Sequence, residues 1–180
     1  MANNCFYSMK IVGHNQQDVE EFISMLQYHH KDGKYFARIF EAYVSNIYEE
    51  NEDRFVALVD GDCAWSVYSC MCTGAFTYYD RNCEKDNEIT NLAIETKRLN
   101  LIVEIFSEEP GIGFAEHIIF DNGTQILMEE EDYGEYYNDE NLSIEEFEEE
   151  NGLRLTEKQK EKLIEEQYVC IGGYDMEFTI

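Results

Sequence analysis

Basic residues are scarce in this chain. Its 180 residues include 13 Lys and Arg against 39 Asp and Glu, which gives a formal net charge of −26 at pH 7. Binding to a nucleic-acid backbone relies on Lys and Arg to displace counterions, so this composition disfavours direct binding of free nucleic acid. The same negative field repels anionic membranes and attracts basic protein surfaces. The charge therefore predicts a basic protein partner, with no nucleic acid or membrane bound directly.

Long apolar runs, a secretory signal and paired cysteine motifs are also missing. No stretch approaches the roughly 20 apolar residues that span a bilayer, and the first ten residues lack a basic region followed by an apolar run. The six cysteines form no CxxC pair and no disulfide framework. We therefore expect buried free thiols in a protein of a reducing host cytoplasm. A zinc site at Cys70, Cys72 and Cys83 is the weaker alternative, because the spacing is poor.

The composition is nevertheless that of a folded protein. Apolar residues make up 44% of the chain and aromatic residues 14%, which excludes the weakly hydrophobic class of disordered proteins. The length fits one domain with a sizeable core and an appendage.

The negative charge is concentrated toward the end of the chain. Residues 129–180 hold 18 of the 39 acidic residues but only 4 of the 13 basic ones. Within them, the acidic block 129–150 has twelve carboxylates and no Lys or Arg, together with Tyr136, Leu142 and Phe147. A run of like charge normally belongs to a disordered tail, which lacks such core-forming residues. We interpret the block as a folded polyanion.

Strand and helix patterns alternate over the first 106 residues. In order, the pattern predicts a strand at Phe6–Val12, a helix from Asn15 through Leu26, a strand within Tyr35–Ile47, a strand at Phe55–Val59 that Gly61-Asp62 interrupts and Ala64–Cys72 resumes, a helix at Asn87–Leu99 and a strand at Leu101–Phe106. The order βαββαβ predicts an α+β fold of the ferredoxin-like type, an antiparallel sheet with helices on one face.

A hairpin and two helices are expected after this unit. Asp121-Asn122-Gly123 is a strong turn signal between the strands Phe114–Phe120 and Thr124–Met128. Capping-box spacing starts a helix at Ser143 and another at Thr156, with Gly152 as the stop between them. Terminal strands are expected at Tyr168–Ile171 and Met176–Ile180. We therefore predict a ferredoxin-like domain with an appended hairpin at 1–137 and an acidic helical extension at 138–180, which packs on that domain and ends in a short strand.

Three segments are similar to a known family. They are Asn3-Asn4-Cys5, Gly61-Asp62-Cys63-Ala64-Trp65-Ser66-Val67 and Ser107-Glu108-Glu109-Pro110-Gly111-Ile112-Gly113-Phe114. In this order they resemble the YubB-type ferredoxin-like proteins of phages, plasmids and related mobile elements, over residues 1–137. Asn4 departs from the Trp that many members carry. The resemblance implies a ferredoxin-like fold and a mobile-element gene, and it implies no catalytic residues.

The acidic block is the candidate partner-binding surface, with a solvated face kept for solubility as the alternative. In the helix that starts at Ser143, glutamates three or four residues apart repel one another. Solubility does not require so dense a cluster, whereas a basic groove would relieve the repulsion. The predicted contact residues are Glu129, Glu130, Glu131, Asp132, Glu135, Tyr136, Tyr137, Asp139, Glu140, Glu145, Glu146, Glu148, Glu149 and Glu150.

Catalytic candidates are weaker. Asp60 and Asp62 point to one face of a strand and would hold Mg²⁺ with Glu41 or Glu104, although Asp-Gly-Asp is also common turn chemistry. His29-His30 and His117 are general-base candidates without a recognisable Ser or Cys partner, so structural roles are favoured. We therefore predict no metal and no cofactor, with Mg²⁺ only under the enzymatic alternative.

These observations favour an inhibitor over an enzyme. The leading hypothesis is a phage or mobile-element protein that inhibits a host nucleic-acid-binding defence, most concretely an anti-CRISPR protein directed at a single-protein (type II) RNA-guided nuclease or its guide-RNA complex. Such effectors hold nucleic acid in positively charged channels. The alternatives are a metal-dependent nuclease or guide-RNA-trimming factor that uses Asp60 and Asp62, and an accessory phage protein without a defence role.

Overall fold

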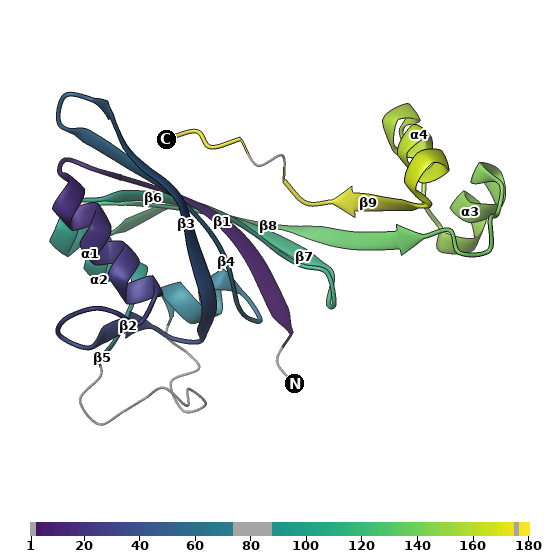
Figure 1. Ribbon diagram of the computed structural model, residues 1–180. Coiled ribbons are helices and arrows are strands. Elements are labelled where there is room, and N and C mark those ends of the chain that lie inside the picture. The colour runs from purple at the N-terminus through teal and green to yellow at the C-terminus, as the bar shows by residue number, and fades with distance from the viewer. Residues whose placement is uncertain (1–2, 74–87, 175–176) are drawn as a thin grey trace.

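The structure is a computed structural model that describes residues 3–73, 88–174 and 177–180 (Figure 1). Its elements are β1 (Asn4–Gly13), α1 (Gln16–Leu26), β2 (Lys34–Phe36), β3 (Ile39–Asn51), β4 (Arg54–Ala64), the short π-helix η1 (Tyr68–Cys72), β5 (Glu88–Thr90), α2 (Leu92–Leu99), β6 (Ile102–Glu109), β7 (Phe114–Asp121), β8 (Thr124–Tyr137), α3 (Ile144–Asn151), α4 (Glu157–Glu166) and β9 (Tyr168–Gly172). No helix in these described ranges has the length and apolar character needed to cross a bilayer.

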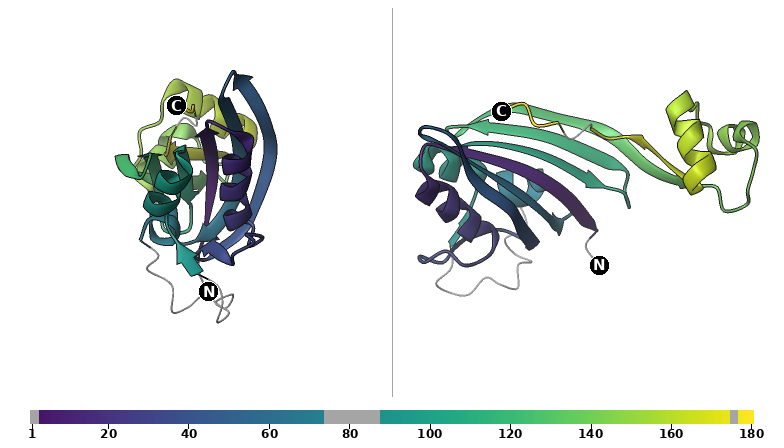
Figure 2. Two further views of the ribbon diagram at one scale, coloured as in Figure 1. Left: turned by 90° about the vertical axis from the view of Figure 1, so that its left-hand side faces the viewer. Right: turned by 45° about the horizontal axis from the view of Figure 1, so that its top comes forward.

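The long strands form one curved antiparallel sheet in the order β3-β4-β1-β6-β7-β8-β9. The short strands β2 and β5 make a separate parallel pair. Helices α1 and α2 lie on one side of the sheet, called the inner face below, and the opposite side is the outer face (Figure 2). The predicted α+β class with a mostly antiparallel sheet is therefore confirmed.

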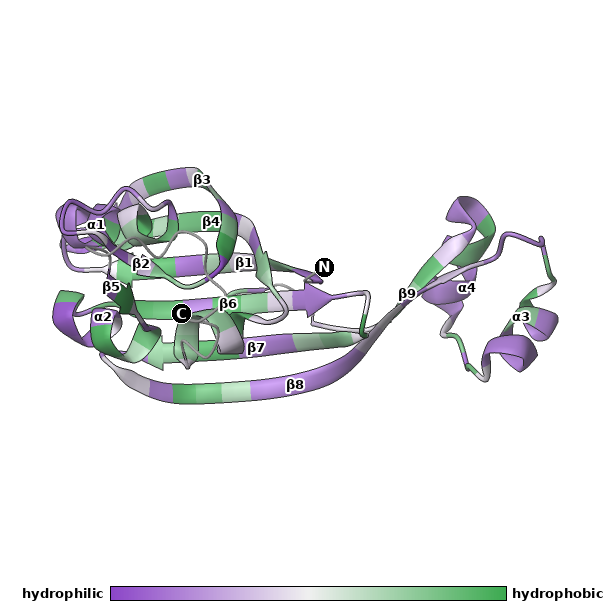
Figure 3. Ribbon diagram, turned by 90° about the horizontal axis from the view of Figure 1, so that it is seen from below, coloured by the Kyte–Doolittle hydropathy of each residue, from purple (hydrophilic) through white to green (hydrophobic). Residues whose placement is uncertain are grey.

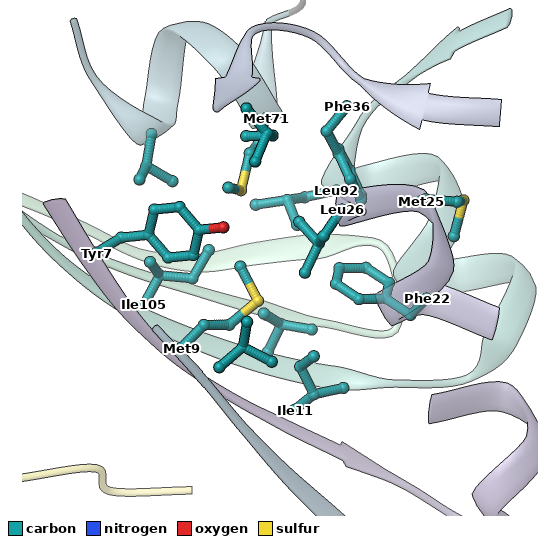
Figure 4. Packing of buried hydrophobic residues seen from close by; sticks show 14 of the residues in the cluster. Tyr7, Met9, Ile11, Phe22, Met25, Leu26, Phe36, Met71, Leu92 and Ile105 are labelled. Atoms are coloured by element: carbon teal, nitrogen blue, oxygen red, sulfur yellow. The ribbon is translucent and has the colours of Figure 1, made fainter. Parts of the chain in front are cut away.

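The main core lies between the sheet and these helices. Alternate residues of β1 are buried toward the helices, including Tyr7, Met9 and Ile11. They pack with Phe22 of α1 and Leu92 of α2 (Figure 4). Each fully buried large side chain contributes about 1.5–3 kcal/mol by leaving water, so this cluster supplies most of the apolar driving force for the sheet domain.

Helix boundaries follow the predicted caps. The Asn15 side chain accepts a hydrogen bond from the Asp18 N–H at 2.9 Å, which confirms the start of α1. Both expected capping boxes are present, at Ser143 for α3 and Thr156 for α4. Gly152 ends α3 in the left-handed conformation, with φ of 67°.

Helices α3 and α4 sit in a separate C-terminal lobe. Pairing of β8 with β7 ends at Asp132, and residues Tyr133 to Tyr137 of β8 pair with β9 instead. The lobe therefore projects from the end of the sheet (Figure 3). The hairpin between β7 and β8 is confirmed at the predicted turn, but β8 runs well past Met128. The lobe has its own hydrophobic cluster of Phe147, Leu155, Leu163 and Val169.

Two predicted segments were wrong, and a third was correct only in part. β4 runs through Gly61 without interruption; a Cβ at this position would lie 2.2 Å from the Glu41 carbonyl oxygen, so the glycine permits close packing. After β4, residues Tyr68–Cys72 form η1 and not a strand. The predicted helix at 87–99 begins only at Leu92, because Asn91 caps it and Glu88–Thr90 pairs with β2 as a strand. Asn87 lies outside the described residues.

The expected strand at 176–180 is only partly described. Met176 lies outside the described residues, and residues 177–180 run across the outer face without strand pairing. Trp65 and Tyr68, which follow β4, are 47% and 36% exposed. Gly111 and Gly113 lie in the turn between β6 and β7.

Candidate acidic surface

A row of carboxylates crosses the outer face of the sheet. Residues paired in register on neighbouring strands point to the same face, and neighbouring strands lie about 4.8 Å apart. From β3 to β8, one such row reads Glu41, Asp62, Phe6, Glu108, Ala115 and Glu131. Four of these six positions are acidic, and Phe6 between them is 55% exposed. The pattern is visible only once the register of six strands is known.

The next row contributes two further carboxylates. It reads Tyr43, Asp60, Ser8, Phe106, His117 and Glu129 from β3 to β8. Asp60 accepts a hydrogen bond from the Ser8 hydroxyl at 2.6 Å, and Asp62 accepts one from the Asn4 amide at 3.0 Å. Asp60 and Asp62, predicted as weak catalytic candidates, are therefore two members of an acidic face.

The carboxylates in the first row are crowded. Burial raises the pKa of Asp62, and the nearby negative charge of Glu41 raises it further. Burial also raises the pKa of Glu108, and the negative charge of Glu135 raises it further. A hydrogen bond from Tyr133 acts in the opposite direction but does not cancel the rise. Burial is the largest cause of both shifts, and a neighbouring carboxylate adds to each. A basic partner would relieve the repulsion.

The acidic block continues this surface along β8 and into the lobe. Glu129 and Glu131 lie at outer-facing positions of β8, Glu130 and Asp132 lie at the alternate positions on the opposite face, and Glu135 follows further along the strand; all five are exposed. Asp139 and Glu140 follow in the exposed loop, and Glu145, Glu149 and Glu150 are exposed on α3. Figure 3 shows this hydrophilic stretch of β8 leading to the lobe.

The acidic part of β8 also has a free edge. Tyr133 donates its N–H to Gly113 beside β7, whereas Asn138 donates to Gln167 beside β9, so the two partners occupy opposite edges of β8. In the described residues, the β9-side edge from Met128 to Asp132 has no strand paired to it. Charged side chains on such an edge oppose pairing with other chains, which is a structural reason for part of the charge.

Two predicted contact residues stabilise the lobe itself. Glu148 is buried, and its carboxylate accepts hydrogen bonds from the Leu155 N–H at 2.7 Å and from Arg154 at 3.3 Å. Glu146 closes the capping box with Ser143. Glu148 therefore holds the α3–α4 connection and is not free to contact a partner.

The two predicted tyrosines differ. Tyr136 is half-buried against the lobe cluster, so its ring supports the lobe. Tyr137 is 58% exposed and stacks on Tyr168 with ring centroids 5.8 Å apart. Of these two tyrosines, only Tyr137 offers an exposed aromatic surface beside the carboxylates.

The catalytic and metal candidates do not gather into one centre in the part of the chain that the structure describes. Across residues 3–73, 88–174 and 177–180, no group of three or more His, Cys, Asp or Glu side chains is placed to hold a metal ion. Glu104 instead binds His117 and the C-terminal segment. His30 is buried and bonded to Glu21, whereas His29 is exposed.

The described cysteines are free thiols. Cys5, Cys63 and Cys70 are buried, and Cys72 is half-buried. Burial raises the pKa of Cys72, and the charge of Glu116 adds to this rise, so its thiol is protonated near neutral pH. Cys83, the third residue of the zinc alternative, lies outside the described residues.

No family model matches the chain, and no curated protein or solved structure matches it either.

Proposed function

We propose that this protein inhibits a nucleic-acid-binding protein by occupying its positively charged channel with an acidic surface. In its most concrete form, a phage or mobile element encodes it and its target is a single-protein RNA-guided nuclease of the host cytoplasm, held either alone or with its guide RNA. The mobile-element origin rests on the resemblance of residues 1–137 to the YubB-type proteins.

One observation carries the proposal: carboxylates from four strands fall in one row on the outer face. Asp62 and Glu108 lie two strands apart, as do Glu108 and Glu131, so charges recur about every 10 Å across the sheet. β8 extends this row along its length through Glu129 and Glu135. A rigid array of this kind needs little ordering when it binds, which favours affinity.

Electrostatics would provide both attraction and exclusion. The positively charged groove of an RNA-guided nuclease normally holds the heteroduplex or the displaced strand. An acidic protein in that groove satisfies the same Lys and Arg side chains, so nucleic acid no longer enters. The protein's own charge prevents it from binding the nucleic acid directly.

A competition experiment tests this function. Labelled duplex DNA is bound to a guide-loaded nuclease of this class, and the protein is added in increasing amounts before gel electrophoresis. Displacement of the DNA at stoichiometric protein supports the proposal. A retained DNA complex at a large excess of protein, for guide-loaded and guide-free nuclease alike, contradicts it.

Matched variants separate the acidic surface from total charge. The surface variant carries Glu41→Gln, Glu108→Gln, Glu129→Gln and Glu131→Gln, and the control carries Glu20→Gln, Glu49→Gln, Glu52→Gln and Glu165→Gln at other exposed positions. Both lose the same charge. We expect at least tenfold weaker competition by the surface variant and little change in the control, and equal weakening would rule out the outer face as the contact.

We also infer that the sheet domain is a ferredoxin-like unit with additions. The assignment is supported by the order β3-β4-β1-β6 with antiparallel neighbours, by α1 following β1 and by α2 preceding β6. The additions are the β2–β5 pair, η1, the β7–β8 hairpin and the lobe. The unit provides a rigid, curved support for the acidic rows.

A further inference from the structure

The end of the chain returns from the lobe to the sheet. β9 ends at Gly172, and Gly172 and Gly173 have φ of 77° and 81°. Tyr174 then packs beside Phe106 and His117 on the outer face. Phe178 contacts the same Phe106 ring, with centroids 5.5 Å apart. These contacts place the segment 177–180, called the tail below, on the face opposite the helices.

Glu104 is the centre of the tail contact. Its carboxylate accepts hydrogen bonds from the Thr179 N–H at 2.6 Å, the Thr179 hydroxyl at 3.0 Å and the Ile180 N–H at 3.0 Å. His117 lies 2.8 Å from the same carboxylate, and Lys10 donates to the Ile180 main-chain oxygen. Main-chain and side-chain groups of the tail are thus recognised together.

The sheet side of this contact is built from buried groups. Glu104 has no exposed surface and Phe106 is only 3% exposed, although both belong to outer-facing positions of β6. A buried carboxylate is costly unless hydrogen bonds satisfy it. Three of the four hydrogen-bonding contacts of Glu104 come from the tail, so the tail completes the site.

We propose that Glu104, Phe106, His117 and Lys10 form a peptide-docking site, and that the tail is its removable ligand in the same chain. The ligand class is an extended peptide with the sequence aromatic, threonine, aliphatic. Phe106 packs against the aromatic ring, and Glu104 accepts hydrogen bonds from the N–H and hydroxyl of the threonine. Lys10 donates a hydrogen bond to the main-chain oxygen of the next residue. This inference rests on the tail geometry and is independent of the acidic-surface proposal.

Self-occupancy sets how the site responds to other peptides. A ligand tethered in the same chain competes at an effective concentration in the millimolar range. A free peptide therefore binds only when the tail is released. The docked tail therefore holds the end of the C-terminal extension against the sheet.

Amide exchange tests whether the tail is docked through Glu104. The full chain is compared with Glu104→Ala and with Asp60→Ala, which removes another outer-face carboxylate that does not touch the tail. We expect exchange at Ile180 to accelerate at least tenfold in Glu104→Ala and to stay unchanged in Asp60→Ala, while the Met9 amide stays protected as a check of the fold. Equal exchange at Ile180 in all three proteins overturns the proposal.

A second variant leaves every sheet residue intact. Thr179→Pro removes the N–H and hydroxyl of residue 179, two of the three tail donors to Glu104. A capped peptide with the sequence of residues 177–180 should therefore shift the NMR resonances of Lys10 and His117 in this variant. The wild-type chain should need at least tenfold more peptide. Adding Glu104→Ala, or replacing the peptide threonine by valine, should weaken binding at least tenfold. Binding that ignores both changes, or absent binding at millimolar peptide, overturns the proposal.

Discussion

The carboxylate of Glu116 on β7 accepts a hydrogen bond from the Val67 main-chain N–H at 2.9 Å. It also accepts bonds from the Tyr68 N–H at 3.4 Å and the Ser107 hydroxyl at 2.7 Å. Glu116 thereby satisfies the first donors of η1 from a distant strand. This contact explains why the chain turns into a helix after Trp65, where the local sequence favours a strand.

Removing this carboxylate should destabilise the sheet domain. Glu116→Ala leaves the buried Val67 N–H and Ser107 hydroxyl without their partner, at a cost of about 2–3 kcal/mol. Glu130→Ala is the matched control, because Glu130 is paired with Glu116 across the strands but is exposed. It should change stability by less than about 0.5 kcal/mol in urea unfolding. Equal effects of the two substitutions would contradict the assigned role.

The glycine at the end of β9 should tolerate no side chain. A Cβ on Gly172 would lie 1.7 Å from the Asp132 carbonyl oxygen, so Gly172→Ala must displace the chain at the β8–β9 junction. Gly152 has a similar φ of 67° but nothing within 4 Å of a Cβ, so Gly152→Ala should cost only about 1 kcal/mol of backbone strain. Unfolding measurements should rank Gly172→Ala as clearly the worse, and the reverse order would be inconsistent with this packing.

Glu148 and its exposed neighbour Glu149 should behave differently. Glu148→Ala removes the acceptor of the Leu155 N–H and should accelerate amide exchange in the lobe at least about tenfold, since one buried donor loses its partner. Glu149→Ala, with the same charge change, should leave lobe exchange unchanged. Exchange in β1 should not respond to either substitution.

The tail contact should weaken in acid. Burial by itself would raise the pKa of Glu104, but hydrogen bonds from Ile180, His117 and Thr179 outweigh it and hold the pKa below the ordinary 4.5. A lowered pKa means that the ionised form is favoured when the tail is docked, so this stabilisation is present above the ordinary value and is lost as pH falls through the lowered one. The stability difference between wild type and Glu104→Ala should therefore be constant from pH 7 to about 5.5 and shrink below it. A difference that grows in acid would contradict this sign.

Binding to a basic target should depend steeply on salt. Exposed charges are screened over about 10 Å at 0.1 M salt, so affinity carried by the outer-face carboxylates should fall with increasing ionic strength. The slope of log affinity against log salt should be smaller for the four-glutamine surface variant than for its control. Identical slopes would assign the contact to another surface.

Sequence patterns correctly predicted those parts of the fold that depend on residues close together in the chain. The side chains of Asn15, Ser143 and Thr156 cap helices by accepting a hydrogen bond from the main-chain N–H three residues later, and the Asp121-Asn122-Gly123 turn depends on its own residues. The start of α2 was missed because the pairing of Glu88–Thr90 with a distant strand outweighs a continuous helical pattern.

Only the part of the acidic surface that consecutive residues form could be predicted from the sequence. The block 129–150 stands out from composition, but its link to Glu41, Asp62 and Glu108 depends on the register of strands far apart in the chain. The buried role of Glu148 was also invisible, since it depends on the loop that follows α3. Charge density is read from sequence, whereas exposure requires the packed structure.

The two-stranded ribbon of β8 and β9 fixes the spacing between the lobe and the sheet. Its five residue pairs, from Tyr133–Gly172 to Tyr137–Tyr168, span about 17 Å at roughly 3.4 Å per residue. A target that touches both regions must match this length as well as the charge. Ribbon length therefore restricts which targets can contact both regions at once.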